Sequence, residues 1–184
     1  MRKFIKKMAQ LISKANNYTN DEAEQVEYAL KMLIFEIIKI IGVIITFSLL
    51  GHSMQAIIAV VAMAIVKPFI GGYHEDSQIK CFIATLVVVD SIIYLSSTLS
   101  INFVAKLILS MVSLYCIYEQ APVINPAMQL TRDELIKRNR AIGIIISMVL
   151  ILISIVFYKY ELISNTILWT IVFQALLMFN KRTV

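Results

Sequence analysis

Apolar runs of about 20 residues recur along the whole chain, and this feature limits its possible folds more than any other. A run of this length is enough for a helix to cross the hydrocarbon core of a bilayer. Hydrophobic residues form 59% of the sequence and charged residues only 16%, so a water-soluble fold would lack the polar surface to cover these runs. The sequence therefore predicts an all-α polytopic integral membrane protein, with residues 1–184 in one membrane-embedded domain.

Six spans are the simplest count. The second is short for a bilayer crossing unless residues 68–70 extend it, and Lys67-Pro68 predicts a kink or break near the membrane face. Four full spans with the second segment re-entrant is an alternative that spacing alone leaves open. The first segment opens with a capping box, Thr-Asn-Asp-Glu. The expected segments are residues 19–50, 54–66, 81–99, 103–118, 141–158 and 163–180.

The chain begins with an amphipathic segment. Residues 2–15 place Phe4, Ile5, Met8 and other apolar side chains on one helical face, with lysines mostly on the other. This pattern predicts an interfacial helix, within residues 1–18, on the anionic cytoplasmic leaflet of the lipid bilayer. A positively charged flank with no further role is the alternative. The apolar run is too interrupted for the core of a signal peptide, so we expect no cleavage.

The distribution of basic residues predicts the orientation. Of the 17 Lys and Arg residues, 13 fall on one side of the expected spans, so both termini and the loop of residues 67–81 should be cytoplasmic in a multi-pass cell-membrane protein. Cys81 and Cys116 then lie near the reducing side, and we expect no structural disulfide. The basic residues form no clustered face of the kind a duplex requires, so we expect no nucleic-acid partner.

Charged residues also occur within the apolar spans. Glu36 and Lys39 are three residues apart and can pair along one helix face. Asp90 lies at the middle of the third span, where a carboxylate is costly unless it is protonated, paired or hydrated. A structural partner such as Lys39 or Lys106 is one interpretation, and a place in a substrate chamber is the other.

The loop between the second and third spans carries the best nucleophile and base in the sequence. A thiol attacks as the thiolate, and an imidazole can take that proton near neutral pH and return it to a leaving group. His74 and Cys81 are candidates for these roles, although such a pair in a loop is more often incidental. No HExxH or CxxC motif occurs, and His52 falls on the opposite side, so we expect no metal and no cofactor.

The local geometry requires a bend. In one continuous helix over residues 74–81 the pair would stand about 10 Å apart along the axis, too far for a hydrogen bond. The two glycines at the start of the loop allow a turn, and Ser77 or Asp76 would cap a helix beginning near Gln78. Cys81 then lies in the first helical turn, where the positive helix end stabilises a thiolate.

The largest polar loop, residues 119–140, is basic and contains a second capping box at residues 131–134. Its charges either fix only the topology or, together with two lysines of the 67–81 loop, bind an acidic substrate segment. The candidate substrate-binding residues are Asp90, Lys67, Lys80, Arg132, Lys137, Arg138 and Arg140.

At this point the chain resembles a known family. Residues 71–74 (Gly-Gly-Tyr-His) followed by Cys81, in a small, basic, six-segment membrane protein, are similar to the accessory gene regulator B family. Its members are membrane cysteine endopeptidases that process quorum-sensing propeptides in Gram-positive bacteria. The resemblance covers nearly the whole chain and includes residues 121–123 (Ala-Pro-Val), which lead to the basic segment. Family members tend to have arginine shortly before the glycines, where this chain has Lys67-Pro68.

The resemblance implies a mechanism and partners. Cys81 would be the nucleophile and His74 its base, acting on a short propeptide with an amphipathic leader and an acidic tail. The acyl-enzyme thioester would then be attacked by a thiol or hydroxyl within the peptide, giving a thiolactone or lactone. The resemblance also suggests that the protein is a homodimer. Candidate oxyanion donors are the Cys81 N–H and the Gln78 side chain, and candidate groups to orient the histidine are Glu75, Asp76 and Glu119.

A non-enzymatic membrane protein is the competing class. In a small transporter or peptide-export subunit, Asp90, Glu36 and Lys39 would line a pathway. Cys81 would then be an ordinary residue at a helix start, and replacing it with serine would leave the function intact.

Overall fold

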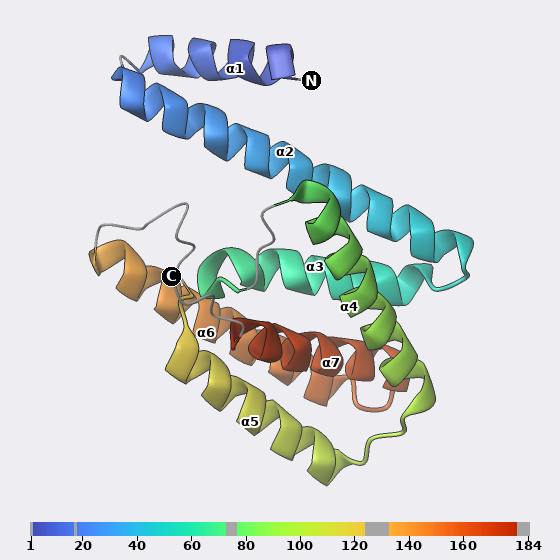
Figure 1. Ribbon diagram of the computed structural model, residues 1–184. Coiled ribbons are helices and arrows are strands. Elements are labelled where there is room, and N and C mark those ends of the chain that lie inside the picture. Colours follow the sequence, from blue (N-terminus) through green and yellow to red (C-terminus); the bar gives the residue numbers. More distant parts are fainter. Residues whose placement is uncertain (1, 17, 73–76, 124–132, 180–184) are drawn as a thin grey trace. The chain divides into compact units, whose positions relative to one another are not determined.

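A computed structural model describes residues 2–16, 18–72, 77–123 and 133–179, and these residues form seven α-helices and no β-strand (Figure 1). The all-α prediction is confirmed. The helices are α1 (Arg2–Ala15), α2 (Asn20–Leu49), α3 (Ser53–Ile70), α4 (Gln78–Thr98), α5 (Phe103–Gln120), α6 (Asp133–Val156) and α7 (Glu161–Met178).

The described part of the chain contains six helices, α2 to α7, that are long and apolar enough to cross a membrane, as the six-span count predicted. The expected break at Lys67-Pro68 is wrong, because α3 runs through Pro68 and ends at Ile70. Pro68 removes only one hydrogen bond near the helix end, and the buried side chains around it hold the helix together. With 18 residues, or about 27 Å, α3 nearly matches the hydrocarbon thickness, which favours a span over a re-entrant segment.

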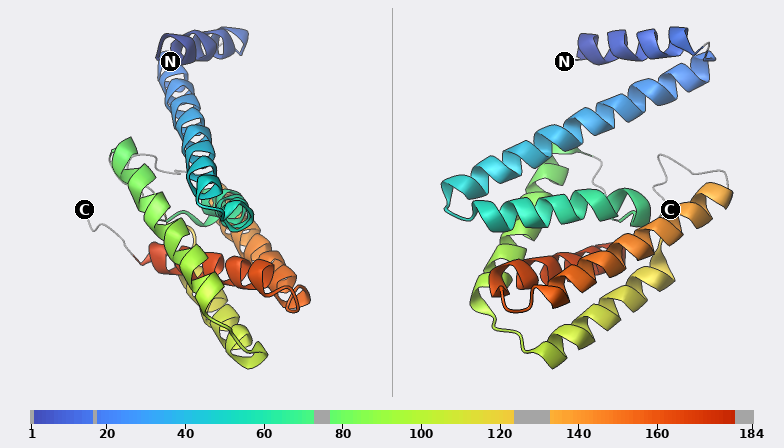
Figure 2. Two further views of the ribbon diagram at one scale, coloured as in Figure 1. Left: turned by 90° about the vertical axis from the view of Figure 1, so that its right-hand side faces the viewer. Right: turned by 180° about the vertical axis from the view of Figure 1, so that it is seen from behind.

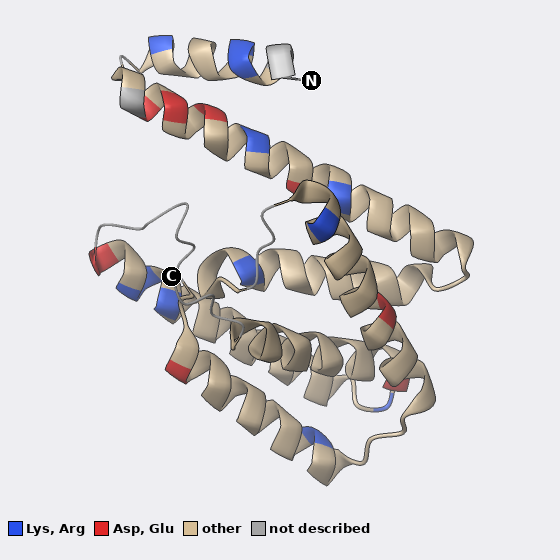
Figure 3. Cartoon of the chain, viewed as in Figure 1, with Lys and Arg blue, Asp and Glu red and all other residues tan. Residues whose placement is uncertain are grey.

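Two polar loops are shorter than the sequence suggested. The 67–81 loop loses residues 67–70 to α3, while residues 78–81 belong to α4 as expected. The 119–140 loop loses residues 133–140 to α6, because its capping box lies where the helix starts and its basic residues are good helix formers. Lys137, Arg138 and Arg140 therefore lie on helical turns. In α3 to α7 the charged residues lie toward the helix ends, except for Asp90 at the middle of α4, whereas α2 also carries charges along its length (Figure 3).

The chain divides within α2 into two compact units, Met1–Gly42 and Val43–Val184. In the first unit, Ile5 and Ala9 are buried on one face of α1, whereas Met8 and Leu11 are exposed. The amphipathic helix therefore keeps apolar side chains available for a lipid surface. Asn16 ends α1 by donating its side-chain amide to the Ile12 carbonyl at 2.9 Å.

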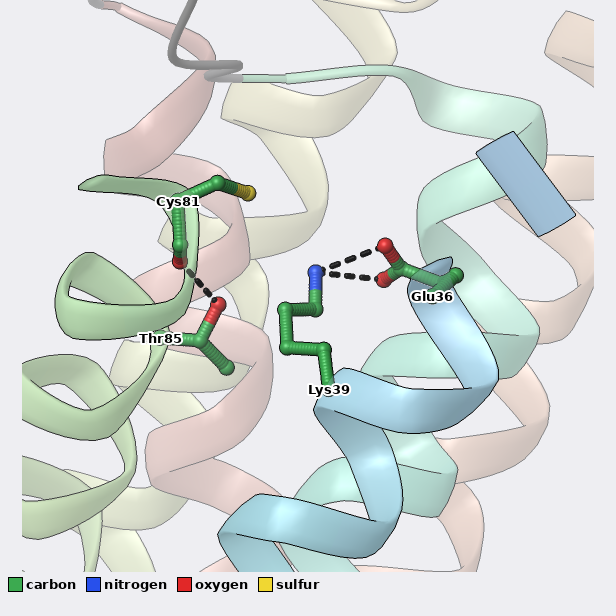
Figure 4. Close-up of polar contacts among 4 residues, drawn as sticks. All are labelled: Glu36, Lys39, Cys81 and Thr85. Atoms are coloured by element: carbon green, nitrogen blue, oxygen red, sulfur yellow. Dashed lines mark hydrogen bonds and ion pairs between the residues drawn. The ribbon is translucent and has the colours of Figure 1, made fainter. Parts of the chain in front are cut away.

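The start of α2 confirms its predicted capping box. The Glu22 carboxylate accepts from the Thr19 backbone N–H at 2.8 Å, and the Thr19 hydroxyl accepts from the Glu22 N–H at 3.4 Å. Further along, Lys39 Nζ lies 2.6 Å from one Glu36 carboxylate oxygen and 2.7 Å from the other (Figure 4). The predicted pair along this helix is also confirmed.

In the second unit α7 is the central helix, and it packs against α3, α4, α5 and α6 (Figures 1 and 2). An unusual number of its buried side chains are polar. Hydroxyls at Thr166 and Thr170 donate to carbonyls one turn earlier in the helix, at 2.6 and 2.7 Å, so the helix satisfies them internally. The other buried polar residues of α7 are Ser164, Asn165 and Gln174.

A polar cluster joins the ends at which α5 and α7 begin. Lys106 is almost fully buried, and its ammonium donates to the Ser164 hydroxyl and, at 3.0 Å, to the Asn165 side chain. It also lies 5.1 Å from the centre of the Tyr158 ring. Ser154 and Ser164 exchange hydroxyl-to-carbonyl hydrogen bonds at 2.8 and 2.6 Å, which tie α6 to α7. From the sequence, Lys106 was considered only as a partner for Asp90. That pairing is wrong, because the Lys106 ammonium binds α7 instead.

An apolar cluster joins the other ends of these helices. It contains Ile70 of α3, Ile117 of α5, Ile151 of α6 and Met178 of α7, all buried. Cys116 packs against this cluster as a partly buried side chain, as a small apolar residue would. The cluster fixes the ends of α3 and α5, from which the two polar loops leave.

Candidate functional site

Cys81 is the fourth residue of α4, which begins at Gln78 as predicted. Its N–H donates to the Ser77 carbonyl at 2.9 Å, and its own carbonyl accepts from the Thr85 hydroxyl at 2.8 Å (Figure 4). Ser77 occupies the N-cap position with an extended backbone, but its side chain makes no capping bond, so that expected cap is wrong. Asp76, the other candidate cap, lies outside the described residues. The thiol is half-buried and in no disulfide, in agreement with the sequence.

The predicted base and two of its three candidate orienting groups lie outside the described residues. These are His74, Glu75 and Asp76. The distance between the imidazole and the Cys81 thiol therefore stays a prediction. The predicted bend is confirmed at both ends of the segment, because α3 stops at Ile70 and Ser77 has extended φ and ψ of −107° and 132°.

The glycine pair that precedes the histidine is held by a distant part of the chain. Gly71 forms an isolated parallel β-bridge with Val123, whose N–H donates to the Ile70 carbonyl at 2.8 Å. Gly71 has a φ of +74°, and a Cβ added to it would lie 2.1 Å from the Val123 carbonyl oxygen. Any other residue would therefore clash with the bridge as well as strain the backbone. The sequence predicted a turn here, but not its partner 52 residues away.

The backbone at the start of α4 offers hydrogen-bond donors. The first N–H groups of a helix find no acceptor within it, and those of residues 78–80 precede the first internal bond, made by Cys81. The Cys81 N–H, one of the two predicted oxyanion donors, is therefore already used within the helix. The Gln78 side chain, the other candidate, is exposed.

The basic candidates differ in their surroundings. Lys67 is half-buried in the last turn of α3, and Lys80 is exposed beside Cys81. On α6, Lys137 and Arg138 are exposed, whereas Arg140 donates to the Tyr118 carbonyl at 2.8 Å and lies 4.9 Å from its ring centre. Arg132 lies outside the described residues, and Glu119 is exposed at the end of α5.

The charged residues within the spans have different surroundings. Asp90 is exposed on α4, and Lys106, one of its expected partners, is instead bound by Ser164 and Asn165 within the second unit. Lys39 pairs with Glu36 in the first unit. Asp90 therefore keeps its predicted place at mid-span but does not pair with Lys106.

The fold defines a polytopic α-helical membrane protein with a half-buried cysteine in the first turn of a span, directly after a loop that begins with two glycines. Residues 5–178 match the family described as Accessory gene regulator B. The chain belongs to this family, as the resemblance indicated.

Two curated relatives agree with this assignment. The AgrB-like protein 1 of Clostridium perfringens (strain 13 / Type A) is 43% identical over 181 residues, which cover 98% of this chain and 97% of the relative. The accessory gene regulator protein B of Staphylococcus aureus (strain bovine RF122 / ET3-1) is 21% identical over 159 residues, covering 85% of this chain and 83% of that protein. No solved structure matches the chain.

Proposed function

We propose that this protein is a membrane cysteine endopeptidase that processes a quorum-sensing propeptide and promotes its cyclisation. The observation that carries the proposal is the position of Cys81 in the first turn of α4, after the Gly-Gly-Tyr-His segment, in a chain of the accessory gene regulator B family. A thiol at this end of the helix directly follows the loop whose histidine would take its proton.

In the proposed reaction His74 takes the proton of the Cys81 thiol, and the sulfur attacks the carbonyl carbon of the scissile peptide bond. The tetrahedral intermediate collapses when the same histidine returns the proton to the leaving nitrogen, so the C-terminal tail departs as an amine. The leading part of the propeptide remains as a thioester on Cys81. The developing oxyanion would be stabilised by the Gln78 side chain or by the N–H groups of the first turn of α4.

Cyclisation follows from the chemistry of the thioester. A cysteine thiol or serine hydroxyl inside the bound peptide attacks the acyl carbon, the new thioester or ester bond closes the ring, and Cys81 leaves as a thiol. The exchange keeps the acyl group activated, whereas hydrolysis would discard that activation. Water must be excluded during this step, and a site at the membrane face, close to the apolar residues of α3 and α4, provides such surroundings.

The proposed substrate has an amphipathic leader and an acidic tail. The leader would lie on the same leaflet as α1, whose Met8 and Leu11 side chains are exposed. The tail would meet the basic residues of α6, of which Lys137 and Arg138 are exposed. We place both termini and this end of the second unit in the cytoplasm of a cell-membrane protein, and we expect a homodimer without metal or cofactor.

The test uses the purified protein in liposomes with synthetic propeptides encoded by short open reading frames near its gene. Mass spectrometry should detect the released tail, a cyclic product, and a mass increase on Cys81 equal to the acylated leader. The His74→Ala variant should be inserted normally but give no adduct. If no candidate peptide ever acylates Cys81, or if Cys81→Ser processes the peptide normally, the proposal is wrong and a non-enzymatic role is favoured.

A further inference from the structure

Gly143 of α6 lies so close to the end of α3 that no side chain fits between them. A Cβ added to this glycine would lie 2.6 Å from Ile70 Cγ2, 3.3 Å from the Ile70 backbone nitrogen and 3.3 Å from Phe69 Cβ. The residue has helical surroundings on both sides, so backbone conformation does not require glycine here. Glycine is required at this position because α6 and the end of α3 approach each other so closely.

Ile70 cannot yield to relieve such a contact. Its side chain is fully buried in the apolar cluster, so another rotamer would need space that the cluster does not have. Its carbonyl accepts the Val123 N–H at 2.8 Å, and the next residue, Gly71, touches the Val123 carbonyl. A displacement of Ile70 would therefore also move Gly71, the first residue of the loop, together with its bridge to Val123.

The same stretch of α6 also holds the other side of this bridge. Arg140, three residues before Gly143, donates to the Tyr118 carbonyl at 2.8 Å, and Val123 follows Tyr118 by five residues. The contacts therefore form a closed circuit from α6 to the end of α3, across the bridge to the chain after α5, and back to α6. We call this circuit of Gly143, Ile70, Gly71, Val123 and Arg140 the α3 clamp.

We infer that Gly143 is a positioning residue for the reaction, because its close contact sets where α3 ends and where the chain leaves toward His74, two residues beyond Gly72. This inference rests on the proposed function. A shift of about 1 Å in a reacting group can lower the rate of a chemical step about a hundredfold. A glycine needed only for packing would instead change stability and leave turnover per folded molecule unchanged.

The experiment measures tail release and Cys81 acylation by the wild type, Gly143→Ala, Ile70→Leu and the double variant in liposomes. Gly143→Ala should lower kcat about 10- to 100-fold with little change in KM. Leucine has no methyl branch at Cβ, so Ile70→Leu removes the Cγ2 atom that the alanine would meet. The double variant should therefore recover kcat to within about threefold of Ile70→Leu alone, a non-additive result expected for residues in contact.

The control is Ala141→Val, which adds methyl groups at an exposed position two residues away on α6 and should leave kcat unchanged. Thermal unfolding in detergent reports the fold independently of substrate, and the unfolding temperature should not follow the loss of kcat. If Gly143→Ala is not recovered from membranes, Arg140→Lys loosens the clamp from its other side and should also lower kcat.

The possible results separate the inference from the proposed function. An unchanged kcat in Gly143→Ala overturns the inference while acylation of Cys81 in the wild type stands. A loss of kcat that follows the unfolding temperature and is not rescued by Ile70→Leu assigns the glycine to packing and also overturns it. If the wild type never acylates Cys81, the proposed function fails and the inference fails with it.

Discussion

Cys81 and Cys116 are both half-buried cysteines in membrane helices, yet their surroundings give them different expected roles. Cys81 lies in the first turn of α4, next to a polar loop, whereas Cys116 packs against the apolar cluster within α5. A thiol packed among apolar side chains is ordinarily inert, whereas one beside a polar loop can meet a base and a substrate. The position in the helix therefore distinguishes a nucleophile from a packing residue.

Removal of each thiol tests this distinction. Cys81→Ala should lower tail release by about a thousandfold or more, because without a nucleophile only the binding and oxyanion contributions remain. Cys116→Ala removes a small part of the core packing and should keep most of the activity. Both variants would be assayed for released tail at equal amounts of inserted protein. A dead Cys116 variant beside an active Cys81 variant would reverse the assignment.

Lys106 has a structural role that can be tested apart from activity. Lys106→Met keeps the length of the side chain but leaves the Ser164 hydroxyl and the Asn165 carbonyl without their buried donor. Each unsatisfied buried acceptor costs about 1–3 kcal/mol, so the unfolding temperature in detergent should fall by several degrees. The exposed Lys159 supplies the control, since Lys159→Met should change the unfolding temperature by less than about one degree. An equal fall of the unfolding temperature in both variants would show that the buried hydrogen bonds of Lys106 do not contribute to stability.

The first turns of α6 place two exposed cations where a substrate tail could meet them. Replacing Lys137 and Arg138 together with glutamine should raise the apparent KM several-fold, with a smaller effect on kcat, because exposed ion pairs are individually weak and act mainly on binding. The effect should shrink at high salt. Lys159→Gln, at the end of the unit where α7 begins, is the matched control. If KM depends on neither salt nor the charge of the tail, these residues only set the topology.

The amphipathic helix α1 is expected to concentrate substrate on the membrane. Deleting residues 2–15 should reduce processing at low propeptide expression more than at high expression, because only local concentration is lost. The readout is the ratio of processed to total peptide in cells over a range of expression levels. An equal loss at every level would instead make α1 part of the fold or of the site.

Helix positions followed well from the sequence, whereas contacts between helices did not. Apolar length and capping patterns predicted where α2, α4 and α5 begin, because such signals act over a few residues. Pro68 was misjudged because a local rule for proline ignores the packing that stabilises the end of α3. Gly143 gave no signal, since a glycine within a span does not reveal which helix it faces. The bridge between Gly71 and Val123 likewise joins segments that no local pattern connects.

The site shows the same division between local and distant information. The sequence predicted the start of α4 near Gln78 and the turn at Gly71, because both signals lie in adjacent residues. The partners of Lys106 lie 58 and 59 residues away, and only the fold brings them together. The polar pair Ser164-Asn165 inside an expected span was the available sign that a buried cation would be found nearby.

The orientation of the whole chain can be tested with single cysteines in a Cys81→Ala, Cys116→Ala background. Ser100→Cys lies in the turn between α4 and α5, and Lys137→Cys lies at the start of α6; both positions are exposed. The basic residues on the α6 side predict that an impermeant maleimide labels only Ser100→Cys in intact cells, and both positions after the membrane is opened. Labelling of Lys137→Cys in intact cells would invert the topology and place the Gly-Gly-Tyr-His segment outside.

The central position of α7 has a consequence for how the protein is made. The ribosome synthesises α3, α4, α5 and α6 before α7, yet all four pack against α7 in the finished fold. Until α7 enters the bilayer, Lys106 lacks its two acceptors and must find water or lipid headgroups, so the earlier helices cannot reach their final arrangement. If synthesis stopped before residue 161, helices α3 to α6 would therefore pack only loosely against one another and stay accessible to membrane proteases. The described helix that is synthesised last is therefore the one that completes the packing of the second unit.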